Sequence, residues 1–218
     1  MLRPPQLEGR SPSTLNLIGG RLCLDFVNSV GARRFSRSGE MKIRDEKLND
    51  YLDLLAWGHQ AGALTNAEAE ALALESSQHQ KEAAAVFQRA IRFREAMYHI
   101  LHAKLSHKQP NEADLLVLNE EFRVTRGAEH LVIEKARFNW RWSAPDSALD
   151  RALWPVARSA AELLTQDDLS RLRQCGGDDC GWIFLDTSRN RGRRWCDMRD
   201  CGNVAKVRRF RRRLSAAH

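Results

Sequence analysis

The chain has 218 residues, of which 43% are hydrophobic and 29% are charged, and its formal net charge is +7. This length suits one domain of ordinary size together with a small additional module, and the hydrophobic content suffices for a packed core. A membrane-spanning helix needs roughly 20 consecutive apolar residues, and no apolar run of the sequence approaches that length. The composition therefore excludes a protein that spans a membrane, and we expect no membrane partner.

The first 44 residues predict a leader, one packed segment and a loop. Residues 1–14 contain three Pro and predict a poorly ordered leader. Apolar and polar residues alternate over residues 21–26, which is typical of a strand, and a helix from Asp25 onward is an equal alternative. Basic residues, Ser and Gly over residues 31–44 predict a loop.

The next segment predicts four helices. An N-cap at residue 49 or 50 begins a helix that ends near Gly62. The pattern Thr-Asn-Ala-Glu at residues 65–68 is a capping box that opens a second helix. Apolar side chains recur at helical spacing over residues 81–105, which give the clearest helix, and a shorter amphipathic helix follows Pro110.

Alternating aromatic residues then predict a β-hairpin. Its strands are residues 131–133 and 138–142, and Phe138, Trp140 and Trp142 would share one face.

The sequence returns to helix before its last fifth. Residues 146–164 predict a helix that is kinked at Pro155 or begins there, and Asp167 would cap a short helix that follows. The predicted fold class is α+β. A mostly helical domain with a small sheet occupies residues 15–168, and a metal-binding module occupies residues 169–218.

Four of the five cysteines form two pairs. Each pair has four residues between its cysteines and fifteen residues separate the pairs, which consist of Cys175, Cys180, Cys196 and Cys201. Two facing knuckles of this kind suit one tetrahedral Zn²⁺, and four thiolates close its coordination shell, so the metal would be structural. Two disulfides, an iron–sulfur cluster and unconnected thiols are the alternatives.

The fifth cysteine and the first residues bear on the compartment. Cys23 lies alone in an apolar segment and is predicted to be buried. The segment after Met1 contains no apolar core of signal-peptide length. Free and metal-bound thiols are typical of a reducing environment, so we expect a cytoplasmic protein.

Positive charge is concentrated at the C-terminal end. Residues 187–218 hold eleven Lys or Arg and two Asp, whereas the rest of the chain is close to neutral. Such concentration indicates a nucleic-acid contact surface, and a solvated disordered tail is the alternative. The predicted contacts are Arg189, Arg191, Arg193, Arg194, Lys206, Arg208, Arg209, Arg211, Arg212 and Arg213.

The same segment predicts an amphipathic helix. Val207, Phe210 and Leu214 recur three and four residues apart, so they share one helix face. Asn203 stands where an N-cap would, and Gly202 would allow a tight turn after the last cysteine. We expect the apolar face to pack on the metal knuckles and the basic face to meet a polyanion.

Two motifs resemble known families. Cys-x4-Cys followed by Arg-Trp-Cys at residues 194–196 and Cys-Gly-Asn at residues 201–203, with a basic helix next, resembles the CGNR zinc finger. Residues 20–30 resemble the opening of the ABATE domain, which usually precedes that finger in bacterial proteins and is described as a stress-induced transcription regulator. The resemblance implies a treble-type finger, a DNA partner and a bacterial source. The Arg that gives the finger its name is Val204 here, so one phosphate contact is lost if relatives use that Arg for phosphate.

Catalytic motifs are absent from the sequence. It contains neither a Walker-type phosphate loop nor a nucleophile elbow, and its seven His are scattered, so we expect no enzyme. A small-molecule effector would bind at polar and aromatic groups of the N-terminal domain. The candidate pocket residues are Asp25, Asn28, Arg33, Trp140 and Trp142, whose alternative roles are turn capping and core packing.

Three functions follow from these features. The first is a transcription regulator that binds DNA through the finger and the Arg-rich helix and is controlled by an effector, as a homodimer if it resembles many DNA readers. The second is an RNA-binding or protein-interaction module that displays Trp182, Phe184 and Trp195. The third is a redox or metal sensor in which oxidation of the thiolates releases zinc.

Overall fold

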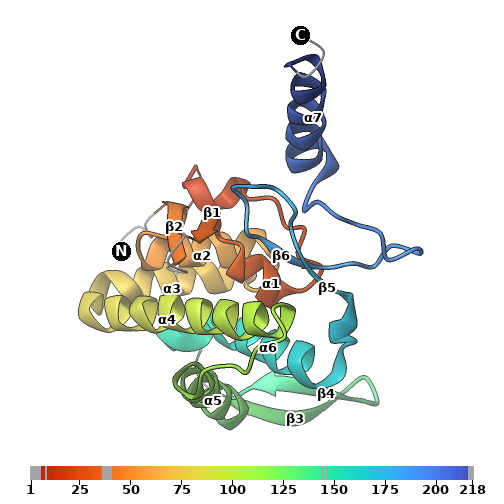
Figure 1. Cartoon of the computed structure of the whole chain (residues 1–218). Helices are drawn as coiled ribbons and strands as arrows, with labels where there is room; N and C mark the ends of the chain where they lie inside the picture. The colour runs from red at the N-terminus through yellow and green to blue at the C-terminus, as the bar shows by residue number, and fades with distance from the viewer. Residues whose placement is uncertain (1–5, 8, 36–40, 144, 146, 216–218) are drawn as a thin grey trace.

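The computed structural model of the protein describes residues 6, 7, 9–35, 41–143, 145 and 147–215. Its described part is mostly helical, and the helices surround α4, Gln80–Leu105, which runs the length of the body (Figure 1). With 26 residues at about 1.5 Å each, α4 is about 39 Å long. The other helices of the body are α1 (Leu22–Val27), α2 (Tyr51–Gln60), α3 (Asn66–Gln78), α5 (Glu112–Gly127) and α6 (Trp154–Gln166).

Local sequence signals begin these helices. The carboxylate of Asp50 accepts a 2.8 Å hydrogen bond from the backbone N–H of Asp53, which caps α2. Thr65 and Glu68 form the reciprocal capping box of α3. Pro155 lies in the first turn of α6, where its missing N–H leaves no helical hydrogen bond unmade. The four helices predicted between residues 49 and 127 are confirmed.

The core lies between α4 and the helices around it. Phe93, Met97 and Leu101 of α4 are buried in the same hydrophobic cluster as Leu24 and Phe26 of α1, which contacts α4. The same cluster continues into the C-terminal module, since its buried members also include Leu172, Ile183 and Leu185. The module therefore shares the hydrophobic core of the helical domain.

Three antiparallel two-stranded sheets complete the described part of the chain. They pair β1 (Val30–Phe35) with β2 (Met41–Glu46), β3 (Glu129–Glu134) with β4 (Arg137–Trp142), and β5 (Leu172–Gln174) with β6 (Ile183–Leu185). The hairpin β3–β4 confirms the predicted aromatic hairpin. Leu131 stands opposite Trp140 and Ile133 opposite Phe138 in its register.

The structure decides one open alternative and corrects one prediction in the first 46 residues. Residues 22–27 form a helix whose apolar side chains are buried, with contacts to both α4 and α6, so the strand is wrong and the helix begins before the predicted start at Asp25. The predicted loop over residues 31–44 is wrong: its described residues belong mainly to β1 and β2, while residues 36–40 lie outside the described part.

The predicted leader is partly packed. Residues 11–14 form one 3-10 turn, and the guanidinium of Arg10 pairs with Asp50 at 2.5 Å and Asp53 at 2.6 Å. These ion pairs hold the leader against the start of α2. Residues 1–5 and 8 lie outside the described part.

The cap predicted at Asp167 is also wrong. Asp168 caps the short 3-10 helix Leu169–Arg171 by accepting a 3.0 Å hydrogen bond from the N–H of Ser170. Asp167 instead pairs with Arg21 at 2.6 Å, which joins the end of α6 to the start of α1.

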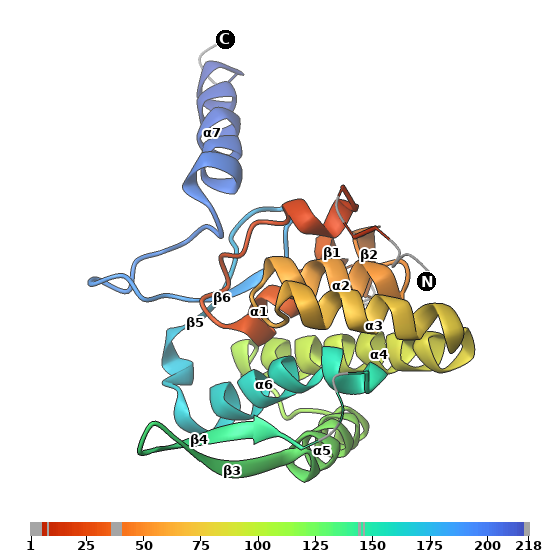
Figure 2. The ribbon, with the colours of Figure 1, turned by 180° about the vertical axis from the view of Figure 1, so that it is seen from behind.

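The last helix, α7 (Asn203–Ser215), leaves the body and extends away from it (Figures 1 and 2). Its apolar stripe does not pack on the metal knuckles as predicted: Val207 is 41% exposed, Phe210 62% and Leu214 52%. The reason is geometric, because only the beginning of α7 lies beside the cysteines and the helix then points outward. No helix in the described part of the chain is both long and apolar enough to cross a membrane.

Candidate metal centre and basic helix

The four predicted metal ligands meet in one place. The sulfur atoms of Cys175, Cys180, Cys196 and Cys201 all lie within 4.8 Å of one another. Four thiolates around one tetrahedral Zn²⁺, with Zn–S bonds of about 2.3 Å, have sulfurs about 3.8 Å apart. The Cys180 and Cys196 sulfurs are 3.6 Å apart, which fits this geometry and is far longer than a disulfide bond of about 2.05 Å.

The first pair of ligands lies on the turn of the β5–β6 hairpin. The N–H of Cys175 donates to the carbonyl oxygen of Trp182 at 2.8 Å, and the N–H of Cys180 donates to that of Gly177 at 3.2 Å. Gly177 lies against the sulfurs, since a Cβ there would be 3.3 Å from the sulfur of Cys201 and 3.2 Å from Cβ of Cys180. A side chain at position 177 would push the ligands apart.

The second pair of ligands lies immediately before α7. The N–H of Cys196 donates to the sulfur of Cys175 at 3.3 Å. Cys201 lies in the π-helical turn Met198–Gly202, which Asp197 caps by accepting a 2.7 Å hydrogen bond from the N–H of Arg199. A hairpin and a helix start that each supply two cysteines form the predicted treble-type arrangement.

Two local predictions at this helix start are wrong. Asn203 has helical backbone angles and lies inside the helix, so it does not serve as the N-cap. Gly202 does not turn the chain sharply. It is needed for close packing, because a Cβ would lie 2.9 Å from Sδ of Met198 and 3.1 Å from Cδ1 of Trp195.

The electrostatics of the cluster call for a cation. Hydrogen bonds from the thiols of Cys180 and Cys196, together with N–H groups, lower the pKa of Cys175. The thiols of Cys180 and Cys196 donate hydrogen bonds to the sulfur of Cys175, which raises the pKa of both because each donor keeps its proton, and the negative charge on the neighbouring sulfur adds to the rise. Burial raises the pKa of Cys201. A divalent cation removes this repulsion, and the buried thiolate set fits Zn²⁺.

The connector between the two pairs is organised by Asp186, which is fully buried. One carboxylate oxygen accepts from the N–H of Ser188 at 2.9 Å and from its hydroxyl at 2.5 Å, and the other accepts from the N–H of Arg193 at 2.9 Å. These bonds lower the pKa of Asp186. The pattern Asp-x-Ser is a turn signal from which this bend can be predicted in the sequence.

Arg193 belongs to the interior of the finger. Its guanidinium lies 4.2 Å from the ring centroid of Phe184. It donates to the carbonyl oxygens of Ile18 at 3.2 Å and Trp195 at 3.1 Å, and also to that of Cys196. Arg193 was predicted to contact nucleic acid, but in the structure its side chain holds the connector in place.

The aromatic residues that were predicted to be displayed also serve the fold. Phe184 is fully buried, so its display for stacking is ruled out. The indole N–H of Trp182 donates to the carbonyl oxygen of Val30 at 2.8 Å. Trp195 is half-buried, and the guanidinium of Arg194 lies 5.0 Å from its ring centroid.

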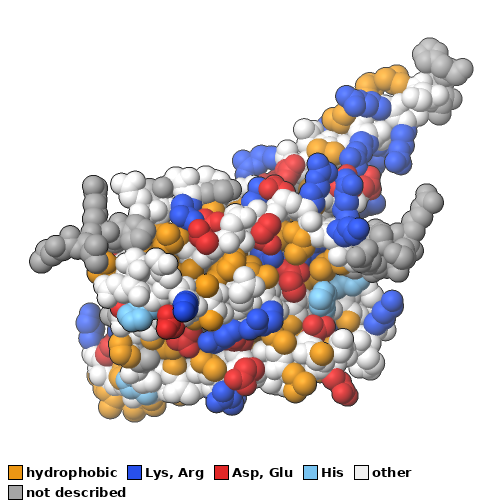
Figure 3. Space-filling view, turned by 90° about the vertical axis from the view of Figure 1, so that its left-hand side faces the viewer, with side chains coloured by type: hydrophobic (Ala, Val, Ile, Leu, Met, Phe, Trp, Pro, Cys, Tyr) orange, Lys and Arg blue, Asp and Glu red, His pale blue; other side chains and the backbone are white. Residues whose placement is uncertain are grey.

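The other predicted nucleic-acid contacts are on the surface. Arg191 lies 3.6 Å from Asp168, and Arg208 pairs with Asp178 at 2.6 Å and lies 3.7 Å from Asp179. Figure 3 shows basic side chains gathered along the projecting arm. Every predicted contact other than Arg193 is exposed: Arg189, Arg191, Arg194, Lys206, Arg208, Arg209, Arg211, Arg212 and Arg213.

The finger is joined to the helical domain by specific hydrogen bonds. The amide of Asn28 donates to the carbonyl oxygen of Ile183 at 2.8 Å and accepts from its N–H at 3.0 Å. The N–H of Arg33 donates to the carbonyl oxygen of Cys180 at 2.9 Å. Gly181 has a φ of +72°, and a Cβ there would lie 2.6 Å from the carbonyl oxygen of Arg33, so only glycine fits this joint. No local sequence pattern signalled these contacts.

The five candidate pocket residues are not brought together. Asn28 and Arg33 lie at the joint with the finger, whereas Trp140 and Trp142 lie on β4, at the opposite side of the body (Figure 1). The guanidinium of Arg33 pairs with Glu95 at 2.5 Å and lies 4.2 Å from the ring centroid of Tyr98. These contacts give Asn28 and Arg33 structural roles.

Asp25 and Trp142 are also engaged within the protein. The carboxylate of Asp25 accepts a 2.7 Å hydrogen bond from the N–H of Gly19, and burial raises its pKa to about 6. Trp142 packs against Trp154 with ring centroids 5.4 Å apart. Trp140 lines a cavity that is open to solvent.

Comparison with known families agrees with these features. A family model described as ABATE, "putative stress-induced transcription regulator", matches residues 20–167, which is more than half of the chain. A model of the CGNR zinc finger matches residues 171–214. A comparison with curated proteins finds no match. The chain therefore belongs to the ABATE family and ends in a CGNR zinc finger, whose four cysteines form the site for one metal ion.

Proposed function

We propose that this protein is a transcription regulator that binds DNA through α7 and the zinc finger. The observation that carries the proposal is the form of α7. The helix has 13 residues, six of them basic and none acidic, and it extends from the body with its side chains exposed. At about 20 Å long, it can lie in the major groove, which admits an α-helix.

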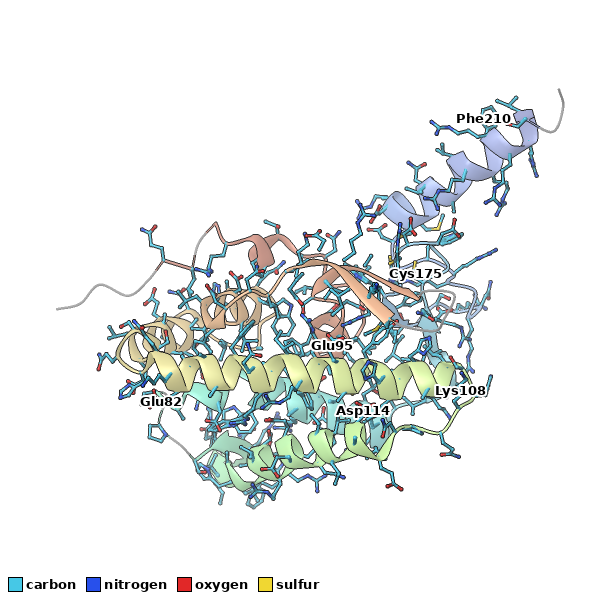
Figure 4. The ribbon with its side chains drawn as sticks, turned by 60° about the vertical axis from the view of Figure 1, so that its left-hand side comes forward. Glu82, Glu95, Lys108, Asp114, Cys175 and Phe210 are labelled. Carbon is cyan, nitrogen blue, oxygen red and sulfur yellow. The ribbon has the colours of Figure 1, made fainter. Side chains whose placement is uncertain are left out.

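Zn²⁺ supplies a structural link in this proposal. When bound, it ties the start of α7 to the β5–β6 hairpin through Cys201 and Cys196 on one side and Cys175 and Cys180 on the other. Four thiolates leave no position for water or substrate, which agrees with a role outside catalysis. Figure 4 places Cys175 at the base of the arm and Phe210 far out along it.

Phosphate contacts would supply most of the affinity, and contacts from a few Arg to base edges would supply specificity. Arg209, Arg211 and Arg212 are exposed and fit either role. Val204 stands where the family name places an Arg, and it is 45% exposed at the start of α7. We therefore propose that this chain makes one cationic contact fewer there than relatives that keep the Arg.

A titration of duplex DNA at several salt concentrations tests the proposal. If about six basic side chains meet phosphates, the logarithm of the binding constant falls against the logarithm of salt concentration with a slope near −5. Arg211→Gln reduces the slope by about 1. The control Arg123→Gln replaces an exposed Arg on α5 and leaves the slope unchanged. A flat response of the intact protein to salt contradicts the proposal.

The exposed apolar stripe of α7 favours a second function. Val207, Phe210 and Leu214 form an uncovered face that a protein partner, or α7 of a second copy in a homodimer, would bury. The alternative to DNA binding is therefore either a protein-interaction module or an RNA-binding module. Competition among duplex DNA, single-stranded RNA and partner proteins separates these outcomes, and sedimentation of the free protein tests the homodimer. We expect each of these proposed binding functions to operate in the cytoplasm.

A further inference from the structure

A hollow lies on the opposite side of the body from the metal centre. It is a cavity of about 450 Å³ between α5, α6 and the β3–β4 hairpin. This volume falls within the range of about 300–1,000 Å³ that is typical of small-molecule sites. Neither the metal centre nor α7 contributes to it, so it is a separate site.

One wall of the cavity is aromatic. Trp140 on β4 and Phe122 on α5 both line it, and Trp140 is 54% exposed. The hairpin that carries Trp140 is held to the body by the packing of Trp142 against Trp154. An indole that stays this exposed on an anchored strand offers a flat surface to a planar ligand.

The floor of the cavity contains a buried hydroxyl. Thr125 of α5 lines the cavity and is only 2% exposed, and its Oγ1 has no hydrogen-bond partner among the described residues. Leaving a buried hydroxyl unpaired costs about 1–3 kcal/mol. A ligand with a polar group at this position would satisfy it.

The charged groups of the cavity leave one cation free. The guanidinium of Arg158 donates to Glu162 at 3.0 Å and to Glu129 at 3.1 Å, so its charge is balanced within the wall. Arg126 also lines the cavity, is exposed, and has no ion pair among the described residues. The site thus offers a guanidinium to an anion, while Glu129 and Glu162 can accept hydrogen bonds from a hydroxyl.

We propose that this cavity binds a small planar aromatic carboxylate that carries a ring hydroxyl. Its ring lies against Trp140, its carboxylate pairs with Arg126, and its hydroxyl bonds with the polar floor. The proposal does not rest on DNA binding, because its readout is occupancy of the cavity in the free protein.

Isothermal titration calorimetry of the full-length zinc-loaded protein with 4-hydroxybenzoate tests the proposal. We expect saturable binding with one site per chain. Cyclohexanecarboxylate keeps the charge but lacks a planar ring, and 4-hydroxybenzyl alcohol keeps the ring but lacks the charge, so both bind more weakly. Absence of saturation with 4-hydroxybenzoate at millimolar concentration overturns the proposed ligand class.

Three variants place the binding in this cavity. Arg126→Gln and Trp140→Ala each lower the affinity about fivefold or more, since each removes one recognition element from an exposed position. Arg123→Gln is the matched control on the same helix, because that side chain is exposed and does not line the cavity. If all three variants bind 4-hydroxybenzoate as tightly as the unmodified protein does, the ligand binds outside this cavity and the proposal is overturned.

Discussion

The backbone N–H of Arg33 donates a 2.9 Å hydrogen bond to the carbonyl oxygen of Cys180, so strand β1 of the ABATE domain is bonded directly to a metal ligand residue. The guanidinium of the same Arg33 pairs with Glu95 on α4 at 2.5 Å. Figure 4 shows Glu95 on α4 below Cys175. A single residue therefore contacts both a metal-ligand residue and the central helix.

Replacing Cys196 with Ser is expected to remove the bound zinc and to lower the melting temperature of the whole chain. Three ligands bind the ion less tightly, and the knuckle that bonds to Arg33 loses its support. A loss of about 2–3 kcal/mol corresponds to about 5–10 °C for a chain of this size. Metal analysis and thermal unfolding followed by circular dichroism measure both effects, and α1–α6 should retain their helical signal.

Cys23→Ala provides the control for that experiment. Cys23 is not among the four cysteines whose sulfurs cluster, and its thiol is fully buried elsewhere, where burial raises its pKa to about 12. Its zinc content should equal that of the unmodified protein. Full zinc occupancy and an unchanged melting temperature in Cys196→Ser contradict the four-thiolate site.

Gly181→Ala is expected to destabilise the protein by more than Gly62→Ala. Both glycines have positive φ, +72° and +70°, and an alanine pays about 1 kcal/mol for this conformation. Only at Gly181 would the new Cβ also meet a backbone atom, the Arg33 carbonyl oxygen at 2.6 Å, whereas nothing lies within 4 Å at Gly62. Urea unfolding of the two variants measures the difference, and equal losses would show that the joint adapts without cost.

Arg193→Gln and Arg194→Gln separate a structural arginine from a surface arginine. Arg193 stacks on Phe184 and donates to three carbonyl oxygens, so its replacement should lower stability by about 2–4 kcal/mol. Arg194 is exposed, and its replacement should change stability by no more than about 0.5 kcal/mol while weakening DNA binding. Denaturant titration and DNA titration of both variants check this, and similar stability losses would place both side chains in the same role.

Asp25→Asn is expected to change how stability depends on pH. Burial raises the pKa of Asp25 from its ordinary 3.8 to about 6 in the folded protein. The folded state then binds the proton more tightly than the unfolded state, so the free energy of unfolding falls as pH rises from about 4 to about 6. Asn keeps an oxygen that can accept from the N–H of Gly19 but does not titrate. The variant should gain stability relative to the unmodified protein across this window, and parallel pH profiles would contradict the shifted pKa.

The sequence by itself determined the features that depend on nearby residues. The caps at Asp50 and Thr65, the periodicity of α4 and the paired spacing of the cysteines all act within a few residues, so each can be read along the chain. The family motifs lie in the same short stretches. These signals sufficed for the α+β class, the aromatic hairpin and the metal ligands.

Only the tertiary structure decided where these parts lie. Asn28 and Ile183 are bonded across 155 positions of the chain, and Arg193 and Ile18 across 175, and no local pattern encodes such pairs. The same holds for the exposed stripe of α7: periodicity shows that Val207, Phe210 and Leu214 share a face, but not whether another element covers it. Burial and polar pairing are set by the whole fold, because each depends on every element that reaches the same point in space.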